Sequence, residues 1–395
     1  MNYHILYGIV FLGAVLSFVP QLAKYRRVML WYVAALLAVF AGLRVGVGFD
    51  YNMYNYMFGR MPTLQQIISE GYSNPFSNIE TGYFILNVIV RSMGFNLNVV
   101  LFIMAVSTLF VLVKAFKVYS PYPALVLMLY VARFYFVRDM GQIRASLAAG
   151  IGLYAIQFLK DNKFGRFFSL VFAAFLFHRS SILLLVLMVC HLIFKKGIPT
   201  KLIIGLLALA FLIGSLDLHP IIMMLEPIIP DHYMLYLSAD WLVFPLGLTN
   251  PVLLMQILII IGALIFRKQM KNPYFEVLFS GYIISTLILA GLNYFGTAAG
   301  RASTYFATFE VLLIPMFIDV FEKKSFKELL EGIKDKAKWG NFIPRHLIDG
   351  RFSYLRPYML LIVFVMFYGF VIYNLIFVHD AMPHFGGPYR SIFNP

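Results

Sequence analysis

The chain has 395 residues, of which 61% are hydrophobic and only 13% charged, and its formal net charge is +14. Because a typical soluble domain carries about 25% charged residues, this composition excludes an ordinary soluble globular protein. Many apolar runs approach or reach the roughly 17–25 residues that a spanning helix needs, and a helix satisfies its own backbone hydrogen bonds in lipid. We therefore predict an all-α polytopic transmembrane protein.

The apolar runs predict one integral membrane domain over residues 1–395, with about 12 spans and a range of roughly 11–14. The first run has no basic region before it and no small-residue cleavage site, so we predict a retained span and not a signal peptide. The predicted spans lie at 3–22, 28–43, 97–114, 121–137, 142–159, 164–178, 180–195, 200–218, 251–267, 274–292, 302–320 and 357–378.

The segment 81–93 leaves the number of spans open. It has only about 13 residues and contains Arg91, which favours an interfacial or re-entrant helix over a span. If it crossed the membrane, every segment before it would change sides. The basic connector that contains Lys24 and Arg27 would then violate the preference of Lys and Arg for the cytoplasm.

Basic connectors predict the topology. Counting spans puts all of them on one side, together with the basic segment 321–356, and Lys and Arg mark that side as cytoplasmic. The net charge then needs no nucleic acid to explain it, and 321–356 is expected to be a cytoplasmic amphipathic surface helix. The outer side holds both termini, the loop 219–250, the tail 379–395 and the loop 44–96. We expect short interfacial or re-entrant helices in 44–96, and a cavity formed by the outer loops.

The two kinds of basic residue are distributed unequally. The cytoplasmic connectors hold 23 of the 32 Lys and Arg residues, including all 16 lysines. Random placement would have left some lysines elsewhere, and the planar arginine fork binds phosphate or carboxylate at two points. The pattern therefore favours an anionic ligand such as a phosphate at the outer leaflet. The remaining cations are Arg44, Arg60, Arg91, Arg133, Arg138, Arg144, Arg179, Arg301 and Arg390.

Aromatic residues and carboxylates occur together in the outer loops. Tyrosines at this depth are typical of the aromatic belt of a membrane protein. Rings that stack on pyranose faces and carboxylates that bind hydroxyl groups would equally suit a sugar ligand. Both interpretations stay open for the candidate sugar-binding residues Tyr51, Tyr83 and Tyr389.

Three candidate site residues precede the predicted third span. Arg44 ends the second span and is either paired with Asp50 to fix the loop or used to hold a phosphate, where Gly46 and Gly48 would allow close approach of the backbone. Asp50 is a candidate catalytic carboxylate. Glu80 is either the N-cap of the following helix or a base that activates a sugar hydroxyl.

Four more candidates lie further along the chain. Arg138 and Arg144 bracket Asp139, and one of them is expected to pair with it while the other faces the cavity. His178, at the tip of a hairpin, is either a packing residue or a group that accepts a proton or donates to a diphosphate. Arg301 opens another span from the outer side.

Other catalytic signatures are missing from the sequence. It contains no P-loop, no dinucleotide-binding glycine pattern, no Ser-His-Asp order and no metal-spaced His/Cys cluster. The single cysteine, Cys190, lies in an apolar run and excludes an internal disulfide. We predict no metal site and no cofactor.

Six motifs follow one another along the chain: GLRVGVGFDYNMY, NIETGYFILN, QIRASLAAGIGLYAIQFLKDNKFGRFF, AAFLFHRSSILLL, GRASTYFATFEVLLIP and PYRSIF. This ordered set resembles the EpsG/Wzy-type family of bacterial polysaccharide polymerases. The positions that match are Arg44, Asp50, Tyr51, Glu80, Tyr83, Arg144, His178, Arg301 and Tyr389. One departure concerns Asp50, because the family often has a G-T-D-Y turn where this chain has Gly48-Phe49-Asp50-Tyr51, and this change is relevant to sugar preference.

The resemblance implies a metal-independent glycosyltransferase of the bacterial inner membrane. It would polymerise undecaprenyl-diphosphate-linked oligosaccharide repeat units into O-antigen or exopolysaccharide at the periplasmic, outer face. The arginines would bind the diphosphate, and Asp50, Glu80 or His178 would accept the proton. Membrane lipid and a chain-length regulator are the other expected partners. A flippase for the same lipid-linked sugars and an O-antigen ligase are the alternatives.

Overall fold

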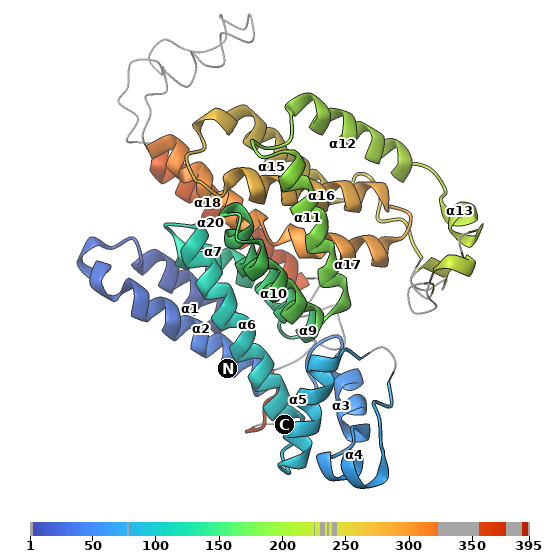
Figure 1. Ribbon diagram of the computed structural model, residues 1–395. Coiled ribbons are helices and arrows are strands. Elements are labelled where there is room, and N and C mark those ends of the chain that lie inside the picture. Colours follow the sequence, from blue (N-terminus) through green and yellow to red (C-terminus); the bar gives the residue numbers. More distant parts are fainter. Residues whose placement is uncertain are drawn as a thin grey trace, which may run out of the picture.

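The computed structural model is a bundle of helices (Figure 1). It describes residues 3–76, 79–224, 226–229, 234, 237–238, 243–322, 355–376 and 389–393. Within these ranges the one β-type pairing is an isolated antiparallel bridge between Arg44 and Ser391. The predicted all-α fold is thus confirmed for the described residues.

The first half of the chain contributes the helices that surround the candidate site. They are α1 (Tyr3–Leu16), α2 (Arg26–Gly42), α3 (Tyr51–Arg60), α4 (Leu64–Glu70), α5 (Thr81–Ser92), α6 (Leu97–Tyr119), α7 (Pro123–Tyr130), α8 (Phe136–Arg138), α9 (Ile143–Lys160), α10 (Phe164–Phe175) and α11 (Leu184–Ile193). A π-helical turn, Val131–Tyr135, joins α7 to α8, and a 3₁₀ turn, Arg179–Leu183, precedes α11.

The second half adds a further group of helices. They are α12 (Thr200–Gly214), α13 (His219–Met224), α15 (Pro251–Phe266), α16 (Phe275–Gly291), α17 (Gly296–Ala307), α18 (Glu310–Glu322) and α20 (Leu355–Asn374). In the bundle α6 packs between α2 and α9, while α16 packs against α12 and α17.

Small residues allow the closest of these packings. A Cβ added at Gly42, the last residue of α2, would lie 2.6 Å from the backbone of Phe102 on α6. Helices in membranes associate through such close backbone approaches, because lipid supplies no hydrophobic drive between them.

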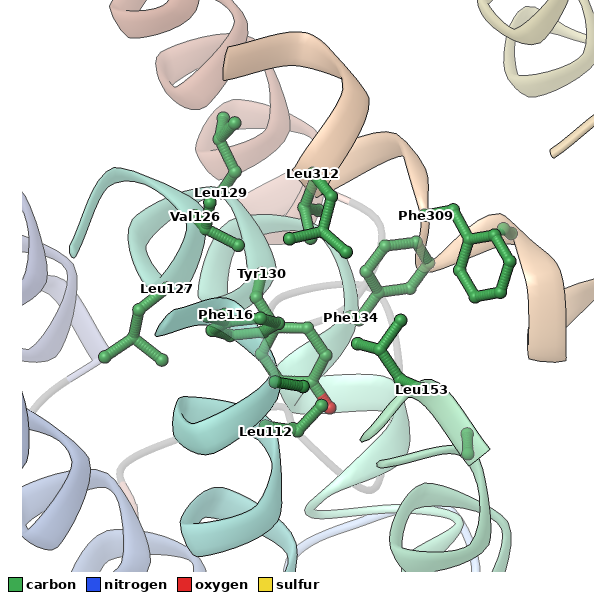
Figure 2. Close-up of a cluster of buried hydrophobic side chains, with 14 of the residues drawn as sticks. Leu112, Phe116, Val126, Leu127, Leu129, Tyr130, Phe134, Leu153, Phe309 and Leu312 are labelled. Carbon is green, nitrogen blue, oxygen red and sulfur yellow. The ribbon is translucent and has the colours of Figure 1, made fainter. Parts of the chain in front are cut away.

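The core is formed by side chains from both halves of the chain (Figure 2). Tyr130 of α7 lies fully buried among Phe116 of α6, Leu153 of α9 and Leu312 of α18. Its hydroxyl donates to Asp139 Oδ2 at 2.6 Å, so the polar end of this large side chain has a partner. The core therefore fixes α7, and with it the loop at 138–142 that borders the site.

Each of the twelve predicted spans overlaps a helix of the structure. Fewer of these helices are long and apolar enough, each by itself, to cross a membrane. Pro20–Gly42, Leu97–Tyr119 and Pro251–Gln269 are long and apolar enough to cross a membrane. A fourth candidate is α17 with α18, whose axes differ by 43° at a short break. The membrane character of the chain is supported by these spans and by the shorter apolar helices, while the count of about twelve spans stays a prediction.

The break between α17 and α18 corrects the expected form of one span. The segment 302–320 was predicted as continuous, whereas the helix begins at Gly296 and is interrupted at Thr308 and Phe309. Apolar composition does not reveal such a break, because both halves remain hydrophobic.

The segment 81–93 forms α5, which has 12 residues and a length of about 18 Å at 1.5 Å per residue. That length is well below the roughly 30 Å of the hydrocarbon core. Helices α3 and α4 lie in the same loop, 44–96, and the expected interfacial or re-entrant position of these helices stays a prediction.

Several connectors that were predicted to be cytoplasmic contact one another. Arg267 bonds to Glu276 and donates to the carbonyl of Ile198 at 2.7 Å, and Asn272 donates to the carbonyl of Tyr119 at 2.7 Å. These connectors therefore meet at one end of the bundle. The predicted cytoplasmic segment 321–356 lies almost entirely outside the described residues, and only parts of 219–250 and 379–395 lie within them.

Candidate functional site

Glu80 is the centre of a polar cluster that joins three distant segments. It is the N-cap residue of α5 and is buried, with 6% of its surface exposed. Arg144 Nη1, from the first turn of α9, donates to Glu80 Oε2 at 2.5 Å. His178 Nδ1 lies 3.1 Å from Glu80 Oε1, which also accepts from the backbone N–H of Arg179 at 3.2 Å. We call Glu80, Arg144, His178 and Arg179 the Glu80 cluster.

The cluster keeps Glu80 ionised. Burial raises the pKa of this carboxyl, but the hydrogen bond from His178 and the charge of Arg144 lower the pKa more strongly, to about 2. A carboxylate with so low a pKa holds a proton poorly at neutral pH. Its favoured role is to hold cationic and N–H groups in place.

The ionised carboxylate also determines how His178 is used. A carboxylate only accepts hydrogen bonds, so the proton of a neutral His178 ring must lie on Nδ1, which faces Glu80. The other ring nitrogen, Nε2, is then a proton acceptor. The side chain is 29% exposed, and its ring lies parallel to that of Tyr305, with centroids 6.2 Å apart. Tyr305 belongs to α17 and was not predicted, although it follows Arg301 by four residues and so shares its helix face.

Buried tyrosines line the inner side of Arg144. The guanidinium carbon of Arg144 lies 5.6 Å from the ring centroid of Tyr83, which is fully buried and 5.9 Å from the ring of Tyr54. Burial raises the pKa of Tyr54 to about 12, although the charge of Arg144 opposes this shift. Both hydroxyls are therefore protonated near neutral pH. Tyr83 packs inside the protein in this conformation and presents no exposed ring face.

A pocket of about 400 Å³ opens beside the cluster. Its lining residues are Glu80 and Thr81 at the start of α5, Phe175 and Leu176 at the end of α10, and Arg179. The two helix ends are in direct contact, because the N–H of Gly82 donates to the carbonyl of Leu176 at 2.7 Å. The pocket thus combines charged and aromatic walls.

Substitution of Gly82 by alanine is expected to lower stability by about 1–3 kcal/mol, because a Cβ there would lie only 2.7 Å from the Leu176 carbonyl oxygen. Thermal unfolding of the purified protein would measure this loss. Gly59→Ala in α3 is the control, since its Cβ would meet no atom within 4 Å. Equal unfolding temperatures for Gly82→Ala and the wild type would contradict the tight contact.

Arg44 and Tyr389 lie together, in a buried contact between the end of α2 and the segment 389–393. The Arg44 side chain is fully buried and bonds to the carbonyls of Ala41 and Val47. The ring of Tyr389 stacks on Phe40 with centroids 3.9 Å apart, and its hydroxyl donates to the Phe40 carbonyl. Arg44 therefore holds the turn after α2, Tyr389 joins the segment 389–393 to α2, and neither residue lines the pocket.

The loop that follows Arg44 is shaped by a glycine. Gly48 has a φ of +115°, and a Cβ on it would lie 2.0 Å from the carbonyl oxygen of Met140. The loop leads to Asp50, the partly buried N-cap residue of α3, and to Tyr51 in its first turn. On the same helix, Tyr54 lies 5.9 Å from the ring of Tyr83, which neighbours Arg144, so α3 packs close to the Glu80 cluster.

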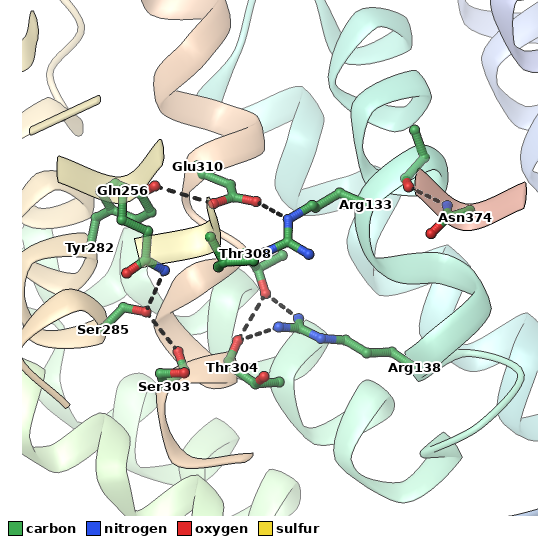
Figure 3. A network of polar contacts seen from close by, with 12 residues as sticks. Arg133, Arg138, Gln256, Tyr282, Ser285, Ser303, Thr304, Thr308, Glu310 and Asn374 are labelled. Carbon is green, nitrogen blue, oxygen red and sulfur yellow. Dashed lines mark hydrogen bonds and ion pairs between the residues drawn. The ribbon is translucent and has the colours of Figure 1, made fainter. Parts of the chain in front are cut away.

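The Arg138 side chain forms hydrogen bonds at the break between α17 and α18 (Figure 3). Its guanidinium donates to the hydroxyl of Thr308 and to the carbonyl of Thr304. It therefore stabilises the interrupted helix that carries Tyr305. The expected pairing of Arg138 or Arg144 with Asp139 is wrong, since Asp139 accepts from Tyr130 and Arg144 bonds to Glu80.

A second ion pair lies beside this break. Arg133 Nε bonds to Glu310 Oε1 at 2.9 Å, and Tyr282 donates to the other carboxylate oxygen at 3.2 Å (Figure 3). Glu310 is fully buried, so it needs such partners. The π-helical turn after α7 carries Arg133, a local irregularity that apolar periodicity does not predict.

The remaining candidate, Arg301, is exposed on α17, one helical turn before Tyr305. The structure therefore brings Glu80, Arg144 and His178 together and places Arg301 on the helix that contacts His178. In the described part of the chain, no three His, Cys, Asp or Glu side chains are grouped as a metal site would require.

Comparison with known proteins gives one result. Residues 27–331 match the model of the EpsG family. This range contains the whole Glu80 cluster, α17 and the pocket. No curated protein and no solved structure matches the chain.

Proposed function

This chain belongs to the EpsG family, whose model matches more than half of it, and we propose that it is a glycosyltransferase that polymerises lipid-linked oligosaccharide repeat units. The proposed donor is a growing glycan on undecaprenyl diphosphate. The proposed location is the inner membrane of a bacterium, with the reaction at the periplasmic face. Membership of the family supports a polymerase of polysaccharides, and the Glu80 cluster supports the chemistry.

The observation that carries the proposal is the arrangement of His178, Glu80 and Arg144. In the reaction, a hydroxyl oxygen of the acceptor sugar forms a bond to C1 of the donor sugar. The bond from C1 to the diphosphate breaks, and its electron pair stays on the diphosphate. His178 Nε2 takes the hydroxyl proton, while Glu80 holds the imidazole in the required tautomer.

The arginines would stabilise the charge that develops on the leaving diphosphate. Arg144 is fixed by Glu80 at one nitrogen and carries further N–H groups, and Arg301 approaches from α17. Asp50 at the start of α3 is proposed to bind sugar hydroxyls of the acceptor, with Tyr51 beside it. Arg44, Arg138 and Tyr389 are proposed to hold the surrounding segments in place.

Replacement of Arg144 by lysine is expected to lower polymer synthesis by about 100-fold, because lysine keeps the charge but loses the planar fork that binds diphosphate and Glu80. The measurement is the ladder of polysaccharide lengths from cells that express the variant at the wild-type level. Arg166→Lys on α10 is the matched control, and its ladder should be unchanged. A normal ladder from Arg144→Lys would remove Arg144 from the reaction.

An assay of the purified protein in liposomes, with lipid-linked repeat units as substrate, distinguishes a polymerase from a flippase. Formation of polymer from lipid-linked repeat units supports the polymerase. Movement of the lipid across the bilayer without polymer would support the flippase instead. Transfer of finished chains to a lipid A core acceptor, without polymerisation, would identify an O-antigen ligase.

A further inference from the structure

One surface of α10 leads directly into the pocket of the Glu80 cluster. Phe168, Phe172 and Phe175 are 46%, 63% and 37% exposed. They are spaced by four and three residues, so they lie on one face of the helix. The row covers about 10 Å along the helix axis. Phe175, its last member, is also a wall of the pocket.

The orientation of this face is fixed by packing. Phe167, Val171 and Ala174, on the neighbouring face of α10, are buried, and α10 packs against α9. The Phe row therefore points away from the protein. On a helix at membrane depth, such a face meets lipid.

The end of the row is polar, and two arginines there face one carboxylate. Arg179, Thr81 and the ionised Glu80 line the pocket next to Phe175, and Arg144 lies on the other side of the Glu80 carboxylate. The backbone N–H of Arg179 is held by Glu80 at 3.2 Å, which fixes the start of the 3₁₀ turn beside the pocket. An arginine fork at this position suits a diphosphate.

We propose that the polyprenyl chain of the lipid diphosphate lies along the Phe row of α10, with its diphosphate in the pocket beside Arg179. This inference rests on the proposed function, which supplies the class of substrate. A water-soluble nucleotide sugar would use the charged end of the pocket but not the row. A lipid diphosphate uses both, because its apolar chain and its anionic group are adjacent.

The first test is binding by the full-length protein in lipid nanodiscs, with undecaprenyl diphosphate and inorganic diphosphate as the two probes. The double variant Phe168→Ala/Phe172→Ala, which leaves the pocket residue Phe175 in place, is expected to bind the polyprenyl probe about tenfold more weakly, because it loses apolar contact area. It should bind inorganic diphosphate as the wild type does. Arg179→Gln should weaken the binding of both probes.

The control is Leu258→Ala/Ile261→Ala on α15, which removes two apolar side chains that are 69% and 48% exposed and lie far along the chain from the pocket. It should leave both affinities unchanged. Equal loss of polyprenyl affinity in the two double variants, or no loss in either, would mean that the Phe row meets bulk lipid only, and the proposal would fail.

A second test does not depend on the variants. A polyprenyl diphosphate that carries a photoreactive group on its first isoprenoid unit should label α10, and a label on other helices would overturn the proposal. Neither test uses an acceptor sugar. If the probe binds along α10 but lipid-linked repeat units give no polymer, the proposed function fails and the binding site stands.

Discussion

Replacement of His178 by alanine is expected to lower polymer synthesis by at least about 100-fold, the lower end of the usual contribution of a general base. The protein should still insert and fold, with a loss of about 1–3 kcal/mol for the hydrogen bond to the buried Glu80 carboxylate, which keeps its bonds from Arg144 and from the Arg179 N–H. Polymer yield from purified protein and lipid-linked repeat units measures the effect.

His178→Asn sharpens this test. An asparagine side chain reproduces the Nδ1 donor to Glu80 but offers no basic nitrogen, so it separates positioning from proton transfer. We expect it to be as inactive as His178→Ala. His191→Ala on α11 is the control, since His191 lies near the end of that helix, 13 residues after His178, and should be fully active. Wild-type activity in His178→Asn would exclude His178 as the base and return Asp50 to that role.

Replacement of Glu80 by glutamine is expected to have the largest effect on stability. Removal of one partner from a buried ion pair leaves an uncompensated charge, here that of Arg144, and costs about 3–5 kcal/mol. Polymer synthesis should fall with it, because both His178 and Arg144 lose the group that positions them. Glu276→Gln is a matched control: its pair with Arg267 is more exposed, so it should cost about 1 kcal/mol or less.

The contribution of Glu80 to the stability of the folded protein should decrease as the pH falls. The pKa of Glu80 is about 2 in the folded protein and 4.5 for an ordinary glutamate. Its contribution to stability is therefore fully present above pH 4.5 and is lost as the pH falls toward 2. The gap in unfolding temperature between wild type and Glu80→Gln should be constant from pH 7 to pH 5 and narrow below that. A constant gap down to pH 3 would contradict the ionised state of Glu80.

Much of the helical architecture could be predicted from the sequence, because apolar runs of sufficient length specify buried or spanning helices. The breaks could not. Val131–Tyr135 and the interruption at Thr308 contain no glycine or proline that would mark them in the sequence. Arg138 provides hydrogen bonds at one of these breaks from a position 170 residues away from Thr308, which no local pattern reveals.

The candidate site could also be predicted only in part. Arginines, carboxylates and a histidine in apolar sequence mark groups that need partners, and the structure brings Glu80, Arg144 and His178 together. Sequence does not specify which partner each group has. Arg44 carried the same signal, yet its side chain bonds to the carbonyls of Ala41 and Val47 at the end of α2. The pairing is decided by helix packing, which depends on the whole chain.

The contacts of His178 come from parts of the chain that are synthesised at different times, and this order matters for how the protein folds in the membrane. The Glu80 cluster uses residues between 80 and 179 only, whereas Tyr305 belongs to a helix that is synthesised much later. Chains fold from the N-terminal side while they leave the ribosome. The ion pair of Glu80 and Arg144 can therefore form in a nascent chain that has inserted only through α11, which would neutralise both charges before the later helices leave the translocon. The contact of His178 with Tyr305 forms afterwards, when α17 docks beside the imidazole.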